Sequence, residues 1–124
     1  MPFIHRDEAT THETHGARFV SYVHSGTGGQ ELAAWRVEVP AGTAAPAHTI
    51  SQEEVFYLLS GRLRLTISGV SADLAVGDAA VAPPGSELRV TNSFDQPAHL
   101  WVTTRTGLRA RLADGSTITP PWAQ

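Results

Sequence analysis

The sequence predicts an all-β fold, an antiparallel sandwich or barrel with little helix, from three observations. Short segments rich in Val, Leu, Thr and aromatic residues recur along the chain, and these residue types favour strands. Clusters of turn-forming residues separate the segments at regular spacing, which is typical of antiparallel β proteins. Helical patterns are scarce. The expected strands are residues 18–24, 32–39, 54–59, 62–68, 79–82, 87–91 and 98–104.

The connections between these strands support the same fold. In chain order they read "SGTGGQ", "PAGTAAP", "SG", "SGVSAD", "VG", "PPG" and "NSFDQP", and each holds residues that favour turns. The stretch "GTGG" could be a phosphate-binding loop, but no helix is expected after it, so a hairpin turn is the better interpretation. The final "TPPWAQ" is expected to be irregular, because paired prolines cannot serve a central strand. We expect one domain over residues 1–124, with a barrel core over 32–104, an N-terminal strand or arm over 1–31 and a tail over 105–124.

The composition excludes several classes of function. The chain has 124 residues, a hydrophobic fraction of 41% and a net charge of −3, so it is expected to be globular and to bind neither nucleic acid nor anionic membranes. Its nine basic residues are all arginine and are scattered. Cysteine is absent, which excludes disulfides, thiolate metal sites and cysteine nucleophiles. The N-terminus "MPFIHRDEATTHETHG" has no apolar core of a signal peptide, so we expect a cytoplasmic protein, and the many Ala, Arg, Gly and Pro residues suggest a GC-rich bacterial genome.

Two stretches that each begin with a glycine carry the strongest signal in the sequence. In the first, Gly42 is followed by five residues, then His48, Thr49 and Ile50, three residues, Glu54, six residues and Gly61. The two glycines stand where tight connections need a positive φ or no side chain.

The second stretch also begins with a glycine that is followed by five residues. Gly77 is followed by five residues, then Pro83, Pro84 and Gly85, two residues, Leu88, three residues and Asn92. The proline fixes the chain as it enters a turn, and the glycine permits the reversal.

These two stretches resemble the two motifs of the cupin family of small jelly-roll barrels. The resemblance implies a double-stranded β-helix whose motif residues face the barrel interior. It also implies a metal held by three histidines and one glutamate, but here Ile50 and Leu88 stand where the family has two of the histidines. His48 and Glu54 remain, and one histidine with one carboxylate is fewer ligands than catalytic metal sites normally have. We therefore expect no cofactor, and a divalent metal bound by His48, Glu54 and an unplaced third ligand is the alternative.

His48 and Glu54 are the candidate catalytic residues. A buried carboxylate without a metal should have a raised pKa, and a charged histidine nearby would lower it again. Such a group can move protons at neutral pH. The alternative is a polar pair that hydrogen-bonds inside the core and has no chemical role.

An apolar pocket is expected around this pair. Residues two apart in a strand share a face, so aliphatic and aromatic side chains should surround the polar groups and accept a largely apolar or aromatic molecule. The alternative is that these side chains simply fill the barrel. In the last expected strand, His99 and Trp101 share one face and Ala98, Leu100 and Val102 the other, and alternation does not say which faces inward. The candidate pocket residues are Ile50, Phe56, Leu58, Leu88, Val90, His99 and Trp101.

Other residues receive simpler interpretations. The "HETH" stretch at 12–15 has spacing that suits neither one strand face nor a helical pair, so it is expected to be a solvated loop. Val55 and Tyr57 should point away from the barrel interior. Trp122 is either an anchor against the barrel or an interface residue, and the resemblance implies a homodimer paired through its sheets.

The function favoured by the sequence is small-molecule binding in the barrel. It includes metal-independent acid–base chemistry, such as isomerisation, cyclisation or lyase-type elimination, and the resemblance to the cupins suggests a place in bacterial secondary metabolism. Two alternatives stay open: a metal-dependent oxygenase or lyase that uses His48 and Glu54, and a non-catalytic ligand-binding or sensory module.

Overall fold

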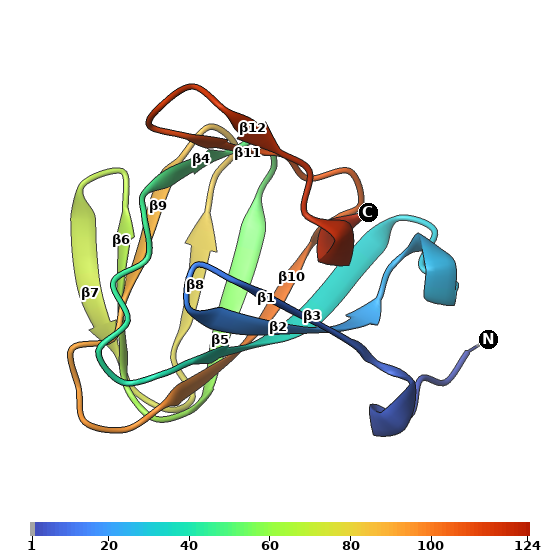
Figure 1. Ribbon diagram of the computed structural model, residues 1–124, viewed down its shortest axis with the longest axis horizontal. Coiled ribbons are helices and arrows are strands. Elements are labelled where there is room, and N and C mark those ends of the chain that lie inside the picture. Colours follow the sequence, from blue (N-terminus) through green and yellow to red (C-terminus); the bar gives the residue numbers. More distant parts are fainter. Residues whose placement is uncertain (1) are drawn as a thin grey trace.

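The protein is built from two antiparallel six-stranded sheets that face each other, as Figure 1 shows for the computed structural model, which describes residues 2–124. In spatial order, the first sheet contains β1 (Thr10–Thr14), β2 (Ala17–Val23), β3 (Leu32–Val39), β10 (Ala98–Arg105), β5 (Glu54–Ser60) and β8 (Ala79–Ala82). The second contains β12 (Thr117–Ile118), β11 (Ala110–Leu112), β4 (His48–Ile50), β9 (Glu87–Thr91), β6 (Leu63–Ile67) and β7 (Val70–Leu74). The expected all-β jelly roll is confirmed.

Helix is confined to three short 3₁₀ turns, η1 (Arg6–Glu8), η2 (Ser25–Thr27) and η3 (Pro121–Ala123). Within residues 2–124, no helix has the length and apolar character needed to cross a membrane.

The core lies between the two sheets because inward-facing and outward-facing side chains alternate along the strands, most regularly in β5 and β10. In β5, Glu54, Phe56 and Leu58 are buried, whereas Val55 and Tyr57 between them are exposed as expected. Across from them, β10 buries the face that contains Leu100 and Val102, which pack in register with β3 and β5. One face of each strand therefore forms the interior, and this interior is where the candidate residues were expected.

All seven expected strands are present, whereas β4 and β7 were not among them. The expected strands 32–39, 79–82 and 87–91 are confirmed to the residue, and the other four differ by one residue at one or both ends. The terminal segments were predicted less well. The "HETH" stretch is not a solvated loop, because Thr10–Thr14 pairs with β2 along its whole length. The segment after residue 104 contributes β11, which pairs with β4, and β12.

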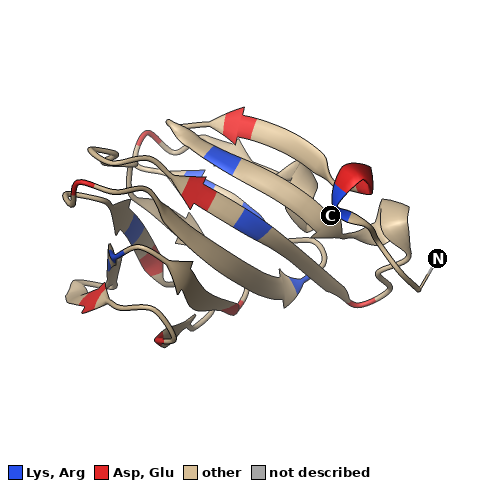
Figure 2. Cartoon of the chain, turned by 90° about the horizontal axis from the view of Figure 1, so that it is seen from below, with Lys and Arg blue, Asp and Glu red and all other residues tan. Residues whose placement is uncertain are grey.

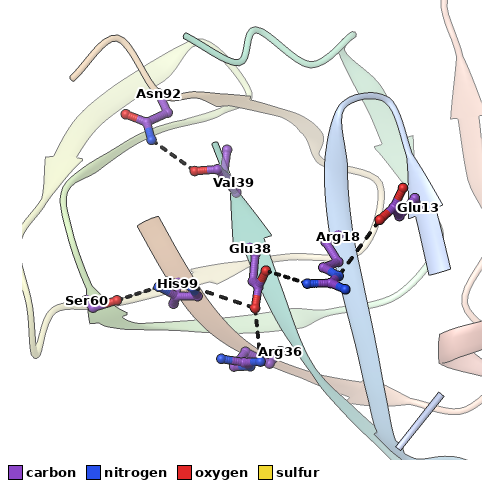
Figure 3. Close-up of polar contacts among 8 residues, drawn as sticks. All are labelled: Glu13, Arg18, Arg36, Glu38, Val39, Ser60, Asn92 and His99. Carbon is purple, nitrogen blue, oxygen red and sulfur yellow. Dashed lines mark hydrogen bonds and ion pairs between the residues drawn. The ribbon is translucent and has the colours of Figure 1, made fainter. Parts of the chain in front are cut away.

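The last residues of the two motifs, Gly61 and Asn92, have structural roles. Gly61 has a φ of +79°, and a Cβ at this position would lie 2.4 Å from the carbonyl oxygen of Pro97, so only glycine fits. Asn92 is fully buried, and its Nδ2 donates to the carbonyl oxygens of Val39 at 3.0 Å and of Gln96 at 2.9 Å. Its Oδ1 accepts from the backbone N–H of Phe94 at 3.1 Å. Asn92 thus fastens the β9–β10 loop to β3 (Figure 3).

Apart from the buried Glu54, charged residues lie on the outside of the sheets and in the loops. Figure 2 shows both signs interspersed, with no tract of one sign in that view. On the outer face of the first sheet, Glu38 lies 3.0 Å from Arg36, 3.5 Å from Arg18 and 3.8 Å from His99 (Figure 3). Exposed pairs of this kind contribute at most about 1 kcal/mol each, so they orient side chains more than they stabilise the fold.

Candidate functional site

A cavity of about 110 Å³ lies between the sheets. It is far larger than the roughly 10–15 Å³ that one water molecule requires. Its wall is mostly apolar and comes from both sheets and both ends of the chain. The lining residues are Thr14, His15, Ala17, Phe19, Trp35, Val37, Val39, Thr43, Ala45, Pro46, His48, Glu54, Phe56, Leu88, Val90, Leu100, Val102, Leu108, Ala110, Leu112, Ile118, Pro120 and Trp122.

Glu54 is the acidic side chain of this wall. It begins β5 on the inward face, beside Phe56, and only 4% of its surface is exposed. Within residues 2–124 no ion pair reaches its carboxylate. Burial therefore removes the carboxylate from water without compensation and raises the pKa of Glu54 to about 8. At neutral pH this side chain is mostly a neutral carboxylic acid, which can donate a proton or a hydrogen bond into the cavity.

His48 faces the same cavity from the opposite sheet. It begins β4 and lies in register between Leu88 of β9 and Leu112 of β11. Burial lowers the pKa of His48, a hydrogen bond to the backbone of Pro46 opposes this, and the nearby His15 lowers it further. The imidazole is therefore a neutral group at neutral pH, able to donate or accept one hydrogen bond.

No hydrogen bond or ion pair joins the two candidate catalytic residues in the described part of the chain. Burial is the cause of the raised pKa of Glu54, and the lowering that a charged histidine nearby would bring is absent. The two side chains approach the cavity from different sheets. Any molecule that contacts both would have to lie between them.

The remaining candidate pocket residues divide into three groups. Phe56, Leu88 and Val90 line the cavity as expected. Ile50 and Leu58 are fully buried but are not part of its wall, so they fill the barrel instead.

His99 and Trp101 belong to the outer face of β10, and their placement in the pocket is wrong. The inward face of this strand carries Leu100 and Val102. Figure 3 shows His99 pointing to Ser60, with its Nδ1 2.6 Å from the Ser60 hydroxyl. Trp101 packs against Tyr22, with ring centroids 5.6 Å apart.

Several wall residues were not expected in the pocket. Trp35, Val37 and Val39 alternate along β3, and this alternation was visible in the sequence without showing which sheet face they would share. Trp122 is an anchor against the chain's own barrel, because it is 8% exposed and stacks on Phe19 at 4.1 Å. No local pattern signals this contact, which joins residues about a hundred positions apart.

The donor set does not fit the metal that the sequence resemblance implies. Ile50 and Leu88 are buried hydrocarbon, and no three His, Cys, Asp or Glu side chains among residues 2–124 converge to hold a metal ion. His48 and Glu54 come from different sheets, and no hydrogen bond or ion pair joins them in the described part of the chain.

Comparison with known proteins is consistent with this architecture. A family model described as "Cupin domain" matches residues 35–104, which is more than half of the chain. No curated protein is detectably similar to the chain in sequence.

Several solved structures share the fold. The polyketide cyclase RemF from Streptomyces resistomycificus superposes with a TM-score of 0.75 at 18% identity, over 85% of this chain and 79% of that one. An RmlC-like cupin from Shewanella frigidimarina gives a TM-score of 0.73 at 18% identity, over 85% and 90% of the two chains. Salicylate 1,2-dioxygenase from Pseudoaminobacter salicylatoxidans gives 0.71 at 18% identity, over 84% of this chain and 31% of that one. At these identities the likeness concerns the fold alone.

Proposed function

Because this chain belongs to the cupin family, we propose that it binds a small, largely apolar or aromatic molecule in the barrel cavity and that Glu54 moves a proton on that molecule without a metal. One observation carries the proposal. A carboxyl group that is 4% exposed and has a pKa raised to about 8 forms part of the wall of an otherwise mostly apolar cavity. A carboxyl group kept neutral in an apolar site is a known means of acid–base catalysis.

The chemistry follows from the protonation states. The carboxylate form of Glu54 can accept a proton from the carbon beside a carbonyl group of the bound molecule, and the protonated form can return a proton to carbon or to a leaving hydroxyl group. Neutral His48, on the opposite wall, can hydrogen-bond the carbonyl oxygen of the same molecule. Isomerisation, cyclisation and elimination all need such proton transfers and no change of oxidation state. The similar fold of RemF, a polyketide cyclase, supports this class and a place in bacterial secondary metabolism.

The proposal can be tested before the natural substrate is known. An enolisable aromatic ketone exchanges its α-hydrogens with deuterated solvent when a general acid and base act on it. We expect the protein to accelerate this exchange, and Glu54→Gln to reduce the acceleration by roughly 100-fold, the lower end of general acid–base contributions. Glu53→Gln is the matched control, because Glu53 is the neighbouring, exposed carboxylate. Equal exchange rates for Glu54→Gln and the unmutated protein would refute the catalytic part of the proposal.

The same assay separates the two alternatives. If the protein is a metal-dependent cupin, the rate will fall with chelator and return with one divalent metal, and metal analysis will show a stoichiometric ion that is lost in His48→Ala. If it is a binding module, the ketone will bind without accelerated exchange. We expect the rate to be insensitive to chelator.

A homodimer and a cytoplasmic location are further parts of the proposal. The support for the dimer is an apolar patch, the β5–β8 patch, on the outer face of the first sheet. Its members are Val55, Tyr57, Leu59 and Val81, each between 42% and 54% exposed. Val55 and Val81 are direct partners across the two strands. Light scattering should give twice the chain mass, and Val55→Asp should give a monomer, whereas Val70→Asp on the distant β7 should not. If the unmutated protein is a monomer in light scattering, the proposed dimer is refuted.

A further inference from the structure

The outer part of the cavity is built from the two ends of the chain. The β1–β2 hairpin contributes four wall residues, from Thr14 to Phe19, and the segment after β10 contributes six, from Leu108 to Trp122. All ten lie outside residues 35–104, the part that the cupin family model matches. These two segments therefore supply the part of the pocket wall that lies outside the family match.

The two segments are firmly attached to each other and to the barrel. The Phe19 and Trp122 rings stack with their planes 12° apart, and the η3 turn that carries Trp122 packs against β2 and β3 (Figure 1). Hydrogen bonds hold this turn: Gly107 N–H donates to the Ala123 carbonyl at 2.9 Å, and Gln124 Nε2 donates to the Leu108 carbonyl at 2.8 Å. Phe19 thereby fixes the hairpin against the barrel, and the exposed hairpin tip, which contributes to the cavity wall, marks the mouth of the cavity.

His15 is the residue at that tip. Its φ is +51° and that of Gly16 is +79°, so both central residues of the two-residue turn have positive φ, the pattern of a type I′ hairpin. Glycine, asparagine or aspartate is usual at the first of these positions, and histidine is among the non-glycine residues that adopt a positive φ most often. Gly16 lies close to the loop on the other side of the mouth, since a Cβ on it would be 3.8 Å from the Thr43 methyl group.

The imidazole of His15 is an exposed ring that contributes to the cavity wall. It is also near enough to His48 for the charges of the two rings to influence each other. Apart from Glu54 and the histidines, most of the cavity wall is hydrocarbon or aromatic. The cavity thus has an apolar body with one acidic group and polar histidine groups toward the hairpin.

We propose that His15 is a specificity-determining residue that selects ligands with a hydrogen-bond-accepting oxygen at the end facing the mouth. The apolar or aromatic body of such a ligand lies against Phe19, Phe56 and Leu88, and the His15 ring N–H donates to the oxygen. This inference rests on the proposed use of the cavity as a binding pocket. It adds the ligand class: an aromatic carbonyl compound or carboxylate, in preference to the corresponding hydrocarbon.

The test compares acetophenone and benzoate with α-methylstyrene, which has the shape of acetophenone but lacks the oxygen. Binding is followed by titration of the tryptophan indole N–H signals in two-dimensional NMR. Trp35 and Trp122 line the cavity and should shift, whereas Trp101 on the outer face should not. His15→Gly removes the ring at a φ that glycine accepts readily, and His5→Gly removes an exposed histidine elsewhere.

We expect His15→Gly to weaken acetophenone and benzoate binding roughly 2- to 10-fold, the net worth of one hydrogen bond, and to change α-methylstyrene binding by less than 2-fold. His5→Gly should change none of them. Equal weakening of all three compounds, or of none, would overturn the role of His15. If none of the compounds shifts the Trp35 and Trp122 signals of the unmutated protein, the binding pocket itself is refuted and this inference with it.

Discussion

Replacing Glu54 by glutamine should change how the stability of the fold depends on pH. In the folded protein the pKa of Glu54 is raised from 4.5 to about 8, so the folded state keeps a proton that the unfolded state releases above pH 4.5. Stability falls with pH wherever the folded state binds more protons. The contribution of Glu54 is therefore fully present below pH 4.5, declines between 4.5 and about 8, and stays low above that.

The size of the effect follows from the shift. Each pH unit in that window costs about 1.4 kcal/mol, so the whole window corresponds to roughly 5 kcal/mol, a large part of the total stability of a small domain. Glutamine has nearly the same shape as glutamate and carries no titratable group. The free energy of unfolding of Glu54→Gln, minus that of the unmutated protein, should rise by about 1 kcal/mol for each pH unit from 5 to 8.

The assay is urea unfolding at pH 5, 6, 7 and 8, with Glu53→Gln as the control. Glu53 is exposed and adjacent, so its substitution should leave the pH profile of the unmutated protein unchanged. Parallel profiles for Glu54→Gln and the unmutated protein would show that the carboxyl group is not buried without a partner, and the reasoning about the site would fail.

Three further substitutions test the fold around the site by the same unfolding measurement. Asn92→Ala removes three hydrogen bonds at a fully buried position and should cost about 2–4 kcal/mol. Gly61→Ala places a Cβ 2.4 Å from the Pro97 carbonyl oxygen at a positive φ and should cost at least about 2 kcal/mol. Trp122→Ala removes the ring stacked on Phe19 and should cost about 3 kcal/mol. For each substitution, a loss of less than about 1 kcal/mol in the free energy of unfolding would contradict the structural role described for that residue.

The longer strands could be predicted because their signals are local. Buried residues alternate with exposed ones along β5 and with half-buried ones from Trp35 to Val39 in β3, and turn residues mark both ends. The strands near the two ends of the chain lack this signal. β1 reads "TTHET" and buries nothing fully, and β11 and β12 have three and two residues. β1 and β12 each pair with the neighbouring strand of a hairpin, and β11 also pairs with β4, which is distant in the sequence.

The candidate site, too, could be predicted only where the signal in the sequence was local. Motif spacing and alternation placed His48, Glu54 and Leu88 on the inner faces, and the structure brings all three to one cavity. Alternation could not decide which face of β10 is inward, so His99 was placed wrongly. It could not reveal His15 either, because its position depends on how the terminal hairpin packs over the mouth.

The most direct test of the account is a titration of the Glu54 side-chain carboxyl carbon by ¹³C NMR, assigned with Glu54→Gln and recorded on protein treated with chelator. The account predicts a midpoint near pH 8 that added divalent cations do not move. A midpoint near the ~4.3 of a free glutamate, or one that drops when a divalent metal is added, would contradict a neutral acid held in an apolar, metal-free cavity.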